Sequence, residues 1–250
     1  MNGTRSRFLC WATALAVGCP MVGWAADADA GWTEMLATAR DAGVAGPAEA
    51  LVQACRAAGW DVRQTEAALG PAIEAATLGG FWDFVAIKVR EGLAKGVDSA
   101  AVAEVAARRL ARLHEAQALV DAWRGPTQRG APGLVEALAS GLEIGFGAET
   151  LARIVNHPGR PPPGQIRAAI EAGEVLRLAG IEEELSEALM ADFLDRDLRR
   201  PDMLRAAHRA RRLHQQGVTP QELRRELWGA DSPEARPGPG SGGQGRRRGR

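Results

Sequence analysis

The charges at Lys88, Glu91 and Lys95 are the clearest local arrangement able to bind something. The chain has two lysines against 29 arginines, and Glu91 falls between the lysines, three residues after one and four before the other. Residues three or four apart share one face of an α-helix, so the three charges should lie together. This spacing predicts a polar contact point, for example for an anionic ligand. The alternative is a row of solvent-exposed ion pairs.

Aromatic side chains are densest between Gly80 and Phe84, where Phe81 and Trp82 are adjacent. Aromatic residues on different sides of one helix are typical of a helix buried between its neighbours. The alternative is an exposed groove that receives a partner peptide or helix, with Phe81 and Trp82 as its contact residues.

The segment 231–250 consists largely of glycine, proline, serine and arginine. It has almost no apolar side chains to offset the entropy of ordering, so we predict a disordered tail. Its end is a cluster of cations on a flexible tether, which predicts weak contact with an anionic surface or a purely solubilising role. The cluster consists of Arg246, Arg247, Arg248 and Arg250.

Recognisable catalytic, cofactor-binding and metal-binding spacings are missing from the sequence. His208 and His214 are six residues apart, which places them on different sides of a helix. Asp192, Asp195 and Asp197 lack the alternating pattern and glycine of a calcium loop. We therefore expect no cofactor, no metal ion and no catalytic residue.

Two neighbouring segments carry opposite charges. Residues 182–197 are rich in glutamate and aspartate, and residues 199–212 are rich in arginine. The simplest interpretation is an antiparallel helix pair whose charges match. Over residues 26–230 there are 24 basic and 29 acidic side chains, so the body is mildly acidic. This balance argues against nucleic acid as the main partner, because phosphate contacts supply most of that affinity.

The N-terminus has the layout of a secretory signal peptide. Residues 1–7 carry two arginines and no acid, residues 8–25 are uncharged and mostly apolar, and small residues follow. We predict a signal peptide over 1–25 and export to the periplasm or the medium. The alternatives are an uncleaved N-terminal membrane anchor and a lipoprotein attached at Cys19. Cys55 is then the one cysteine left, so no internal disulfide is expected.

Nearly every segment after the signal has its apolar residues at helical spacing, as in 99–123. Several helices should end at a glycine followed by a hydrophobic residue, because glycine adopts the left-handed capping conformation without strain. Capping boxes are predicted at Asp61 and Thr219, each with a glutamine or glutamate three residues later. The predicted terminal glycines are Gly43, Gly59, Gly96, Gly145, Gly180 and Gly217.

From Gly59 onward these glycines are 37, 49, 35 and 37 residues apart. This spacing predicts an all-α fold, either a multi-helix bundle or a short α-solenoid of helix pairs. The long interval contains a linker predicted at 125–133, between an N-terminal helical half at 31–124 and a C-terminal half at 134–230. The proline-rich stretch 158–164 is expected to be a non-helical loop.

The segment 88–96 (KVREGLAKG) resembles one found in exported bacterial helical proteins of unknown role, and the resemblance extends to about Leu113. It implies an exported helical protein and no particular activity.

These observations together predict an exported, non-catalytic helical scaffold or interaction module of the cell envelope, with an envelope protein as partner. Two alternatives remain. One is an enzyme whose site assembles from distant residues such as Glu91, His114 or His157. The other is a helical protein that binds a small apolar ligand between its helices.

Overall fold

The computed structural model describes residues 22–124 and 132–229, and within them it is entirely α-helical, as predicted. The eleven helices described are α1 (Val22–Asp41), α2 (Ala45–Ala57), α3 (Val62–Gly79), α4 (Trp82–Ala94), α5 (Ser99–Arg124), α6 (Pro132–Glu143), α7 (Ala148–Val155), α8 (Pro163–Leu178), α9 (Glu183–Asp195), α10 (Arg200–Gln215) and α11 (Pro220–Trp228).

The predicted helix ends are confirmed. All six glycines have positive φ, from 64° at Gly96 to 93° at Gly145. The N–H of the hydrophobic residue after each glycine donates to the carbonyl five residues earlier, as from Ile181 to Leu176 at 3.1 Å. This is the Schellman arrangement, which satisfies carbonyls that the helix end leaves free. Asp197 ends α9 in the same way without a glycine, at φ 50°.

Both predicted capping boxes are also present. The Asp61 carboxylate accepts the N–H of Gln64 at 2.8 Å, and the Gln64 side chain accepts the N–H of Asp61 at 2.9 Å. Thr219 and Glu222 form the corresponding box before α11. One expectation was wrong at its edge, because Pro163 and Gly164 begin α8 instead of belonging to the loop. Proline is tolerated at the first helical position, where its missing N–H has no intrahelical partner.

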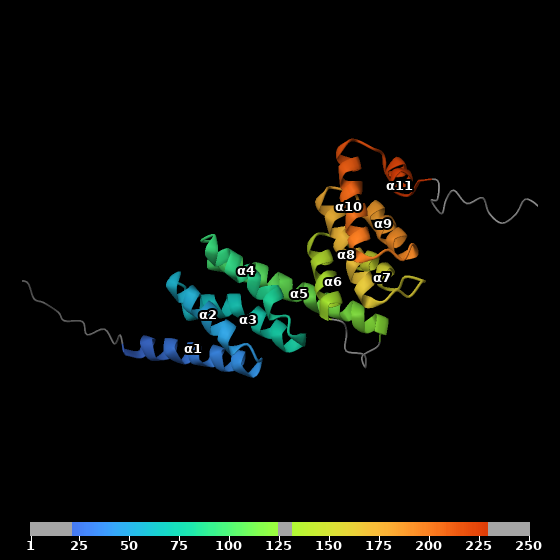
Figure 1. Ribbon diagram of the computed structural model, residues 1–250. Helices are drawn as coiled ribbons and strands as arrows, with labels where there is room; N and C mark the ends of the chain where they lie inside the picture. The colour runs from blue at the N-terminus through green and yellow to red at the C-terminus, as the bar shows by residue number, and fades with distance from the viewer. Residues whose placement is uncertain (1–21, 125–131, 230–250) are drawn as a thin grey trace, which may run out of the picture.

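The helices form two rows in space (Figure 1). Among the odd-numbered helices, α1 contacts α3, α3 contacts α5, α5 contacts α7, and α7 contacts α9. Among the even-numbered helices, α2 contacts α4, α6 contacts α8, and α8 contacts α10. Helices that pack against their second neighbour in the sequence are the arrangement expected of stacked helix pairs. The even row is interrupted between α4 and α6, both of which pack on α5.

Helix α5 lies between the helices that precede it and those that follow it, and it contacts both groups. It is the longest helix described, at 26 residues, and packs against α3 and α4 as well as against α6 and α7. Figure 1 shows α5 running from the group α1–α4 toward the group α6–α11. Its extra length lies in the 49-residue interval between glycines. Most of the predicted linker, residues 125–131, lies outside the described residues, and the division into two halves stays a prediction.

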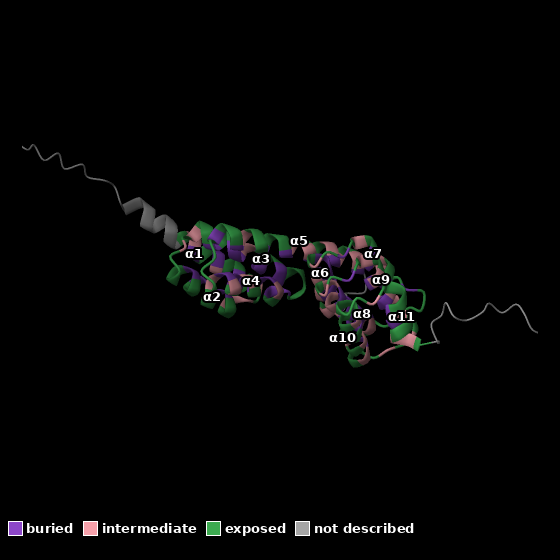
Figure 2. Cartoon of the chain, turned by 90° about the horizontal axis from the view of Figure 1, so that it is seen from above, coloured by how far each residue is buried: buried purple, intermediate pink, exposed green. Residues whose placement is uncertain are grey.

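A continuous apolar core runs between the rows, from Trp32 in α1 to Leu223 in α11. Figure 2 shows buried residues between the helices and exposed residues on their outer sides. Cys55 is fully buried and forms no disulfide, as expected of a small core residue.

The predicted signal peptide lies mostly outside the described residues, which begin at Val22. Helix α1 runs through the segment in which cleavage was expected. Over residues 22–124 and 132–229, none of the helices has the length and apolar character needed to cross a bilayer.

Candidate functional site

The predicted triad lies at the end of α4. Lys88 Nζ is 3.0 Å from Glu91 Oε2, and the two side chains are 34% and 43% exposed. This hydrogen bond and the charge of Lys88 lower the pKa of Glu91, and the more distant charges of Lys95 and Arg109 add to the shift. Lys95 is exposed and caps the helix. Because Lys88 and Glu91 neutralise each other, the geometry favours the ion-pair interpretation of this face.

Arg109 in α5 is buried, with 8% of its area exposed. Its Nε and Nη2 donate to the two Glu143 carboxylate oxygens at 2.6 and 2.8 Å, and its Nη1 donates to the Phe84 carbonyl. The guanidinium also lies 4.0 Å from the centre of the Phe84 ring. Arg109 therefore joins α4, α5 and α6 at one point. Sequence reasoning missed it because its carboxylate partner is 34 residues away.

Glu174 on α8 is the titratable group most affected by its surroundings. Burial, together with the negative charges of Glu171 and Glu143, raises its pKa to about 7. Glu171 itself accepts from Arg167 at 2.8 Å and from Arg200 of α10 at 2.6 Å. Glu174 makes no hydrogen bond or ion pair with any residue that the structure describes.

These side chains form a charged strip across α4, α5, α6, α8 and α10. Apart from Glu174, every member has an opposite charge beside it, and the Arg109–Glu143 and Arg200–Glu171 pairs join neighbouring helices. The charged strip consists of Lys88, Glu91, Arg109, Glu143, Glu171, Glu174 and Arg200.

The other predicted contact residues are not on a described surface. Phe81 and Trp82 are each 4% exposed and belong to the core, so they line no exposed groove. This agrees with the interpretation of a helix buried between neighbours. The arginines at 246, 247, 248 and 250 lie outside the described residues.

The residues named for a dispersed catalytic site each have a separate partner. His114 Nε2 is 3.1 Å from Glu74 on α3, and His157 Nε2 is 3.3 Å from Asp195 on α9. Glu91 pairs with Lys88. The structure does not bring the three together by any of these contacts. In the part of the chain that it describes, no group of three potential ligand residues is placed to hold a metal ion.

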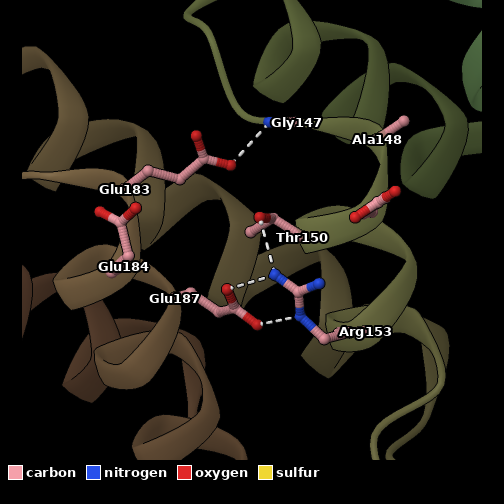
Figure 3. Close-up of a pocket in the computed structure, with 8 residues that line it drawn as sticks. Gly147, Ala148, Thr150, Arg153, Glu183, Glu184 and Glu187 are labelled. Atoms are coloured by element: carbon pink, nitrogen blue, oxygen red, sulfur yellow. Dashed lines mark hydrogen bonds and ion pairs between the residues drawn. The ribbon is translucent and has the colours of Figure 1, made fainter.

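A surface pocket of about 320 Å³ opens between α7 and α9 (Figure 3). Glu183 Oε1 accepts the N–H of Gly147 at 2.7 Å, and hydrogen bonds from Thr150 and then Gly147 lower the pKa of Glu183. Arg153 donates to both carboxylate oxygens of Glu187, at 2.5 and 2.7 Å. These groups bond to one another across α7 and α9, which are consecutive helices of the odd row. The pocket is therefore part of the contact between these two helices.

The acidic segment does not pair with the basic one, contrary to the expectation of a charge-matched α9–α10 pair. Glu187 binds Arg153 of α7, and Asp192, which is 3% exposed, accepts from Arg224 of α11 at 2.8 and 3.0 Å. The acids of α9 therefore point along the odd row, toward α7 and α11.

The arginines of α10 consequently stay on the surface. Arg205 pairs within its own helix with Asp202. Arg209, Arg211 and Arg212 are exposed and make no hydrogen bond or ion pair with any described residue. Exposed arginines without an internal partner are the groups most available to an outside molecule.

Comparison with protein-family models, with curated proteins and with solved structures finds no match for this chain.

Proposed function

We propose that this chain is an exported, non-catalytic helical scaffold that binds another protein of the cell envelope. The observation that supports this most directly is how its polar groups are used. The polar side chains of the α7–α9 pocket and of most of the charged strip hold neighbouring helices together, whereas the exposed Arg209, Arg211 and Arg212 on α10 have no partner among the described residues.

Export is part of the proposal and rests on the N-terminal charge and apolar pattern. Fractionation of cells that express the full chain, followed by N-terminal sequencing of the recovered protein, tests it. We expect the protein in the periplasm or medium with its first residue near position 26 or 29. Recovery of the unprocessed chain from the cytosol would contradict export.

The partner is best sought by site-specific photocrosslinking, because the chain has only two lysines for amine-reactive reagents. A photoreactive residue is placed at one exposed position at a time, Gln53 on α2, Ile87 on α4 or His208 on α10. We expect one discrete protein adduct in intact cells, confined to one of these helices. Absence of an adduct at all three positions would speak against a protein partner.

A further inference from the structure

Helix α10 is the last even-numbered helix among the described residues, and within them no further even-numbered helix covers its far side. The starts of α8 and α10 correspond at a spacing of 37 residues, since their N-caps are Pro162 and Arg199. Gln165 beside the start of α8 donates to Asp197 at 2.8 Å, just before α10 begins. The two helices therefore stack in register.

This register shows which α10 side chains face away from α8. Ala168 and Ala172 lie one turn apart on α8 and are 1% and 0% exposed. Ala168 lines the depression formed with the start of α10, so this side of α8 is the side that α10 covers. The same positions on α10, 37 residues later, are Arg205 and Arg209, and Arg212 follows on the same side.

We define Arg205, Arg209 and Arg212 as the arginine face. All three are exposed, whereas Met203, Ala207 and Ala210 on the inner side of α10 are fully buried. Within the described residues, Asp202 is the one carboxylate paired with any of them. The two alanines of α8 that pack toward α10 thus correspond to two arginines on α10, the last even-numbered helix described.

Elsewhere in the molecule, arginine–carboxylate pairs link helices whose paired residues are about one repeat apart. Arg109 binds Glu143, Arg153 binds Glu187, and Arg224 binds Asp192, with separations of 32 to 34 residues. The planar guanidinium fork suits such paired bonds to carboxylates. The arginine face offers the same chemistry, and among the described residues its one carboxylate partner is Asp202, beside Arg205 on α10 itself.

We propose that the arginine face docks an acidic helix of a partner protein, which lies where the next even-numbered helix would stack. This inference rests on the proposed function and specifies its surface and partner. The partner helix carries carboxylates at spacings of four and three residues, matching positions 205, 209 and 212.

Two other occupants fit the surface less well. An amphipathic helix binds a membrane by inserting apolar side chains, and those of α10 are buried or half-buried against its neighbours. A second copy stacked end to end would present α2, whose charged side chains are one glutamate and one arginine, Glu49 and Arg56. That helix has no net charge to complement the arginine face.

The test uses the full chain and a fluorescent helical peptide of about 20 residues, enough to span α10. The peptide carries glutamates at three positions spaced like the arginine face, and a second peptide carries glutamines there. Binding is measured by anisotropy for the wild-type chain and for the triple variant R205Q/R209Q/R212Q. We expect the triple variant to bind the acidic peptide at least about ten-fold more weakly, and the glutamine peptide to bind weakly to both.

Matched controls separate this surface from net charge. The variant R40Q/R63Q/R108Q removes the same charge from exposed positions of α1, α3 and α5, and should bind the acidic peptide like the wild type. The arginine-face effect should also persist when Arg246, Arg247, Arg248 and Arg250 are glutamine. Equal losses in the two triple variants, or no loss in either, would overturn the proposal and leave the arginine face as a solubilising end cap.

Vesicles of phosphatidylglycerol and phosphatidylcholine test the membrane alternative with the same variants. Arginine-face-dependent binding to these vesicles, without such binding to the acidic peptide, would overturn the proposal. The proposed function can fail independently. Photocrosslinks to an envelope protein that survive in R205Q/R209Q/R212Q would support a scaffold role and refute this docking surface. Peptide binding that depends on the arginine face, without any crosslinked envelope protein, would support the docking surface and speak against the scaffold role.

Discussion

Glu174 shows how one side chain in the charged strip makes stability depend on pH. Its pKa rises from the ordinary 4.5 to about 7 in the folded chain, mainly because it is partly buried. The folded protein therefore holds this proton more tightly than the unfolded chain does. The free energy of unfolding should fall as pH rises from about 4.5 to about 7, and the full penalty should persist above that range.

We expect Glu174→Gln to remove this penalty. At pH 8 the variant should be more stable than wild type by ~1–3 kcal/mol, a range that allows for partial exposure of the side chain. At pH 4 the two should be nearly equal. Urea unfolding at both pH values measures the difference. Glu66→Gln on the exposed side of α3 is the control and should change stability little at either pH. Equal stability of Glu174→Gln and wild type at pH 8 would contradict a raised pKa of Glu174 in the folded protein.

Arg109 and its neighbour Arg108 provide a second comparison between single residues. Arg109 is buried with two bonds to Glu143, whereas the Arg108 side chain is 61% exposed in its pair with Glu104. Arg109→Ala should lower the free energy of unfolding by about 3 kcal/mol, because it strands a partly buried carboxylate. Arg108→Ala should cost no more than about 0.5 kcal/mol. Similar losses in the two variants would show that the contacts of Arg109 with α4 and α6 contribute little to the stability of the protein.

The sequence predicted polar contacts within a helix and missed those between distant helices. Lys88, Glu91 and Lys95 were found because their spacing alone puts them on one face. Arg109 and Glu174 were missed because their surroundings come from helices about one repeat away, and nothing near Arg109 in the sequence distinguishes it from the exposed Arg108.

At the scale of elements, the glycine turns determine where helices stop. Gly180 has φ 82° with no atom within 4 Å of an added Cβ, so replacing it tests backbone strain alone. Gly180→Ala should destabilise the protein by about 1 kcal/mol. Gly164 in the first turn of α8 has the same free space without positive φ, and Gly164→Ala should be neutral or stabilising by up to about 1 kcal/mol. Thermal unfolding of both variants checks the opposite signs, and a stable Gly180→Ala would contradict the cap.

Helix ends were predictable because their signals are local, and Asp61, Thr219 and the six glycines all behave as expected. The cap at Asp197 was missed because aspartate adopts positive φ less often than glycine. The pairing of α9 with α10 was wrong for a different reason. Matching charges along the sequence do not show which neighbour each helix face meets, and the acids of α9 meet α7 and α11.

At the scale of the molecule, the spacing near 36 residues predicted stacked helix pairs or a bundle, and the two rows are the outcome in space. The irregular interval was predicted to contain a linker at 125–133, most of which lies outside the described residues. The length of α5 could not be predicted from this interval. Glycine and proline show where helices are interrupted, but they do not show that one helix packs against two groups of neighbours. Helix α5 contacts α3 and α4, which precede it in the sequence, and also α6 and α7, which follow residues 125–131.

This shared helix predicts that the described molecule unfolds as one unit. Ala111 is exposed in the middle of α5, and Ala111→Pro removes a helical hydrogen bond there at a cost of about 3 kcal/mol or more. Hydrogen exchange should then show a similar loss of protection in α3 and in α8, because both groups of helices pack on α5. Ala101→Pro, in the first turn of the same helix, should have a much smaller effect, since proline is tolerated at that end. Loss confined to α3 and α4, with α8 still protected, would show instead that the helices on either side of 125–131 are independent folding units.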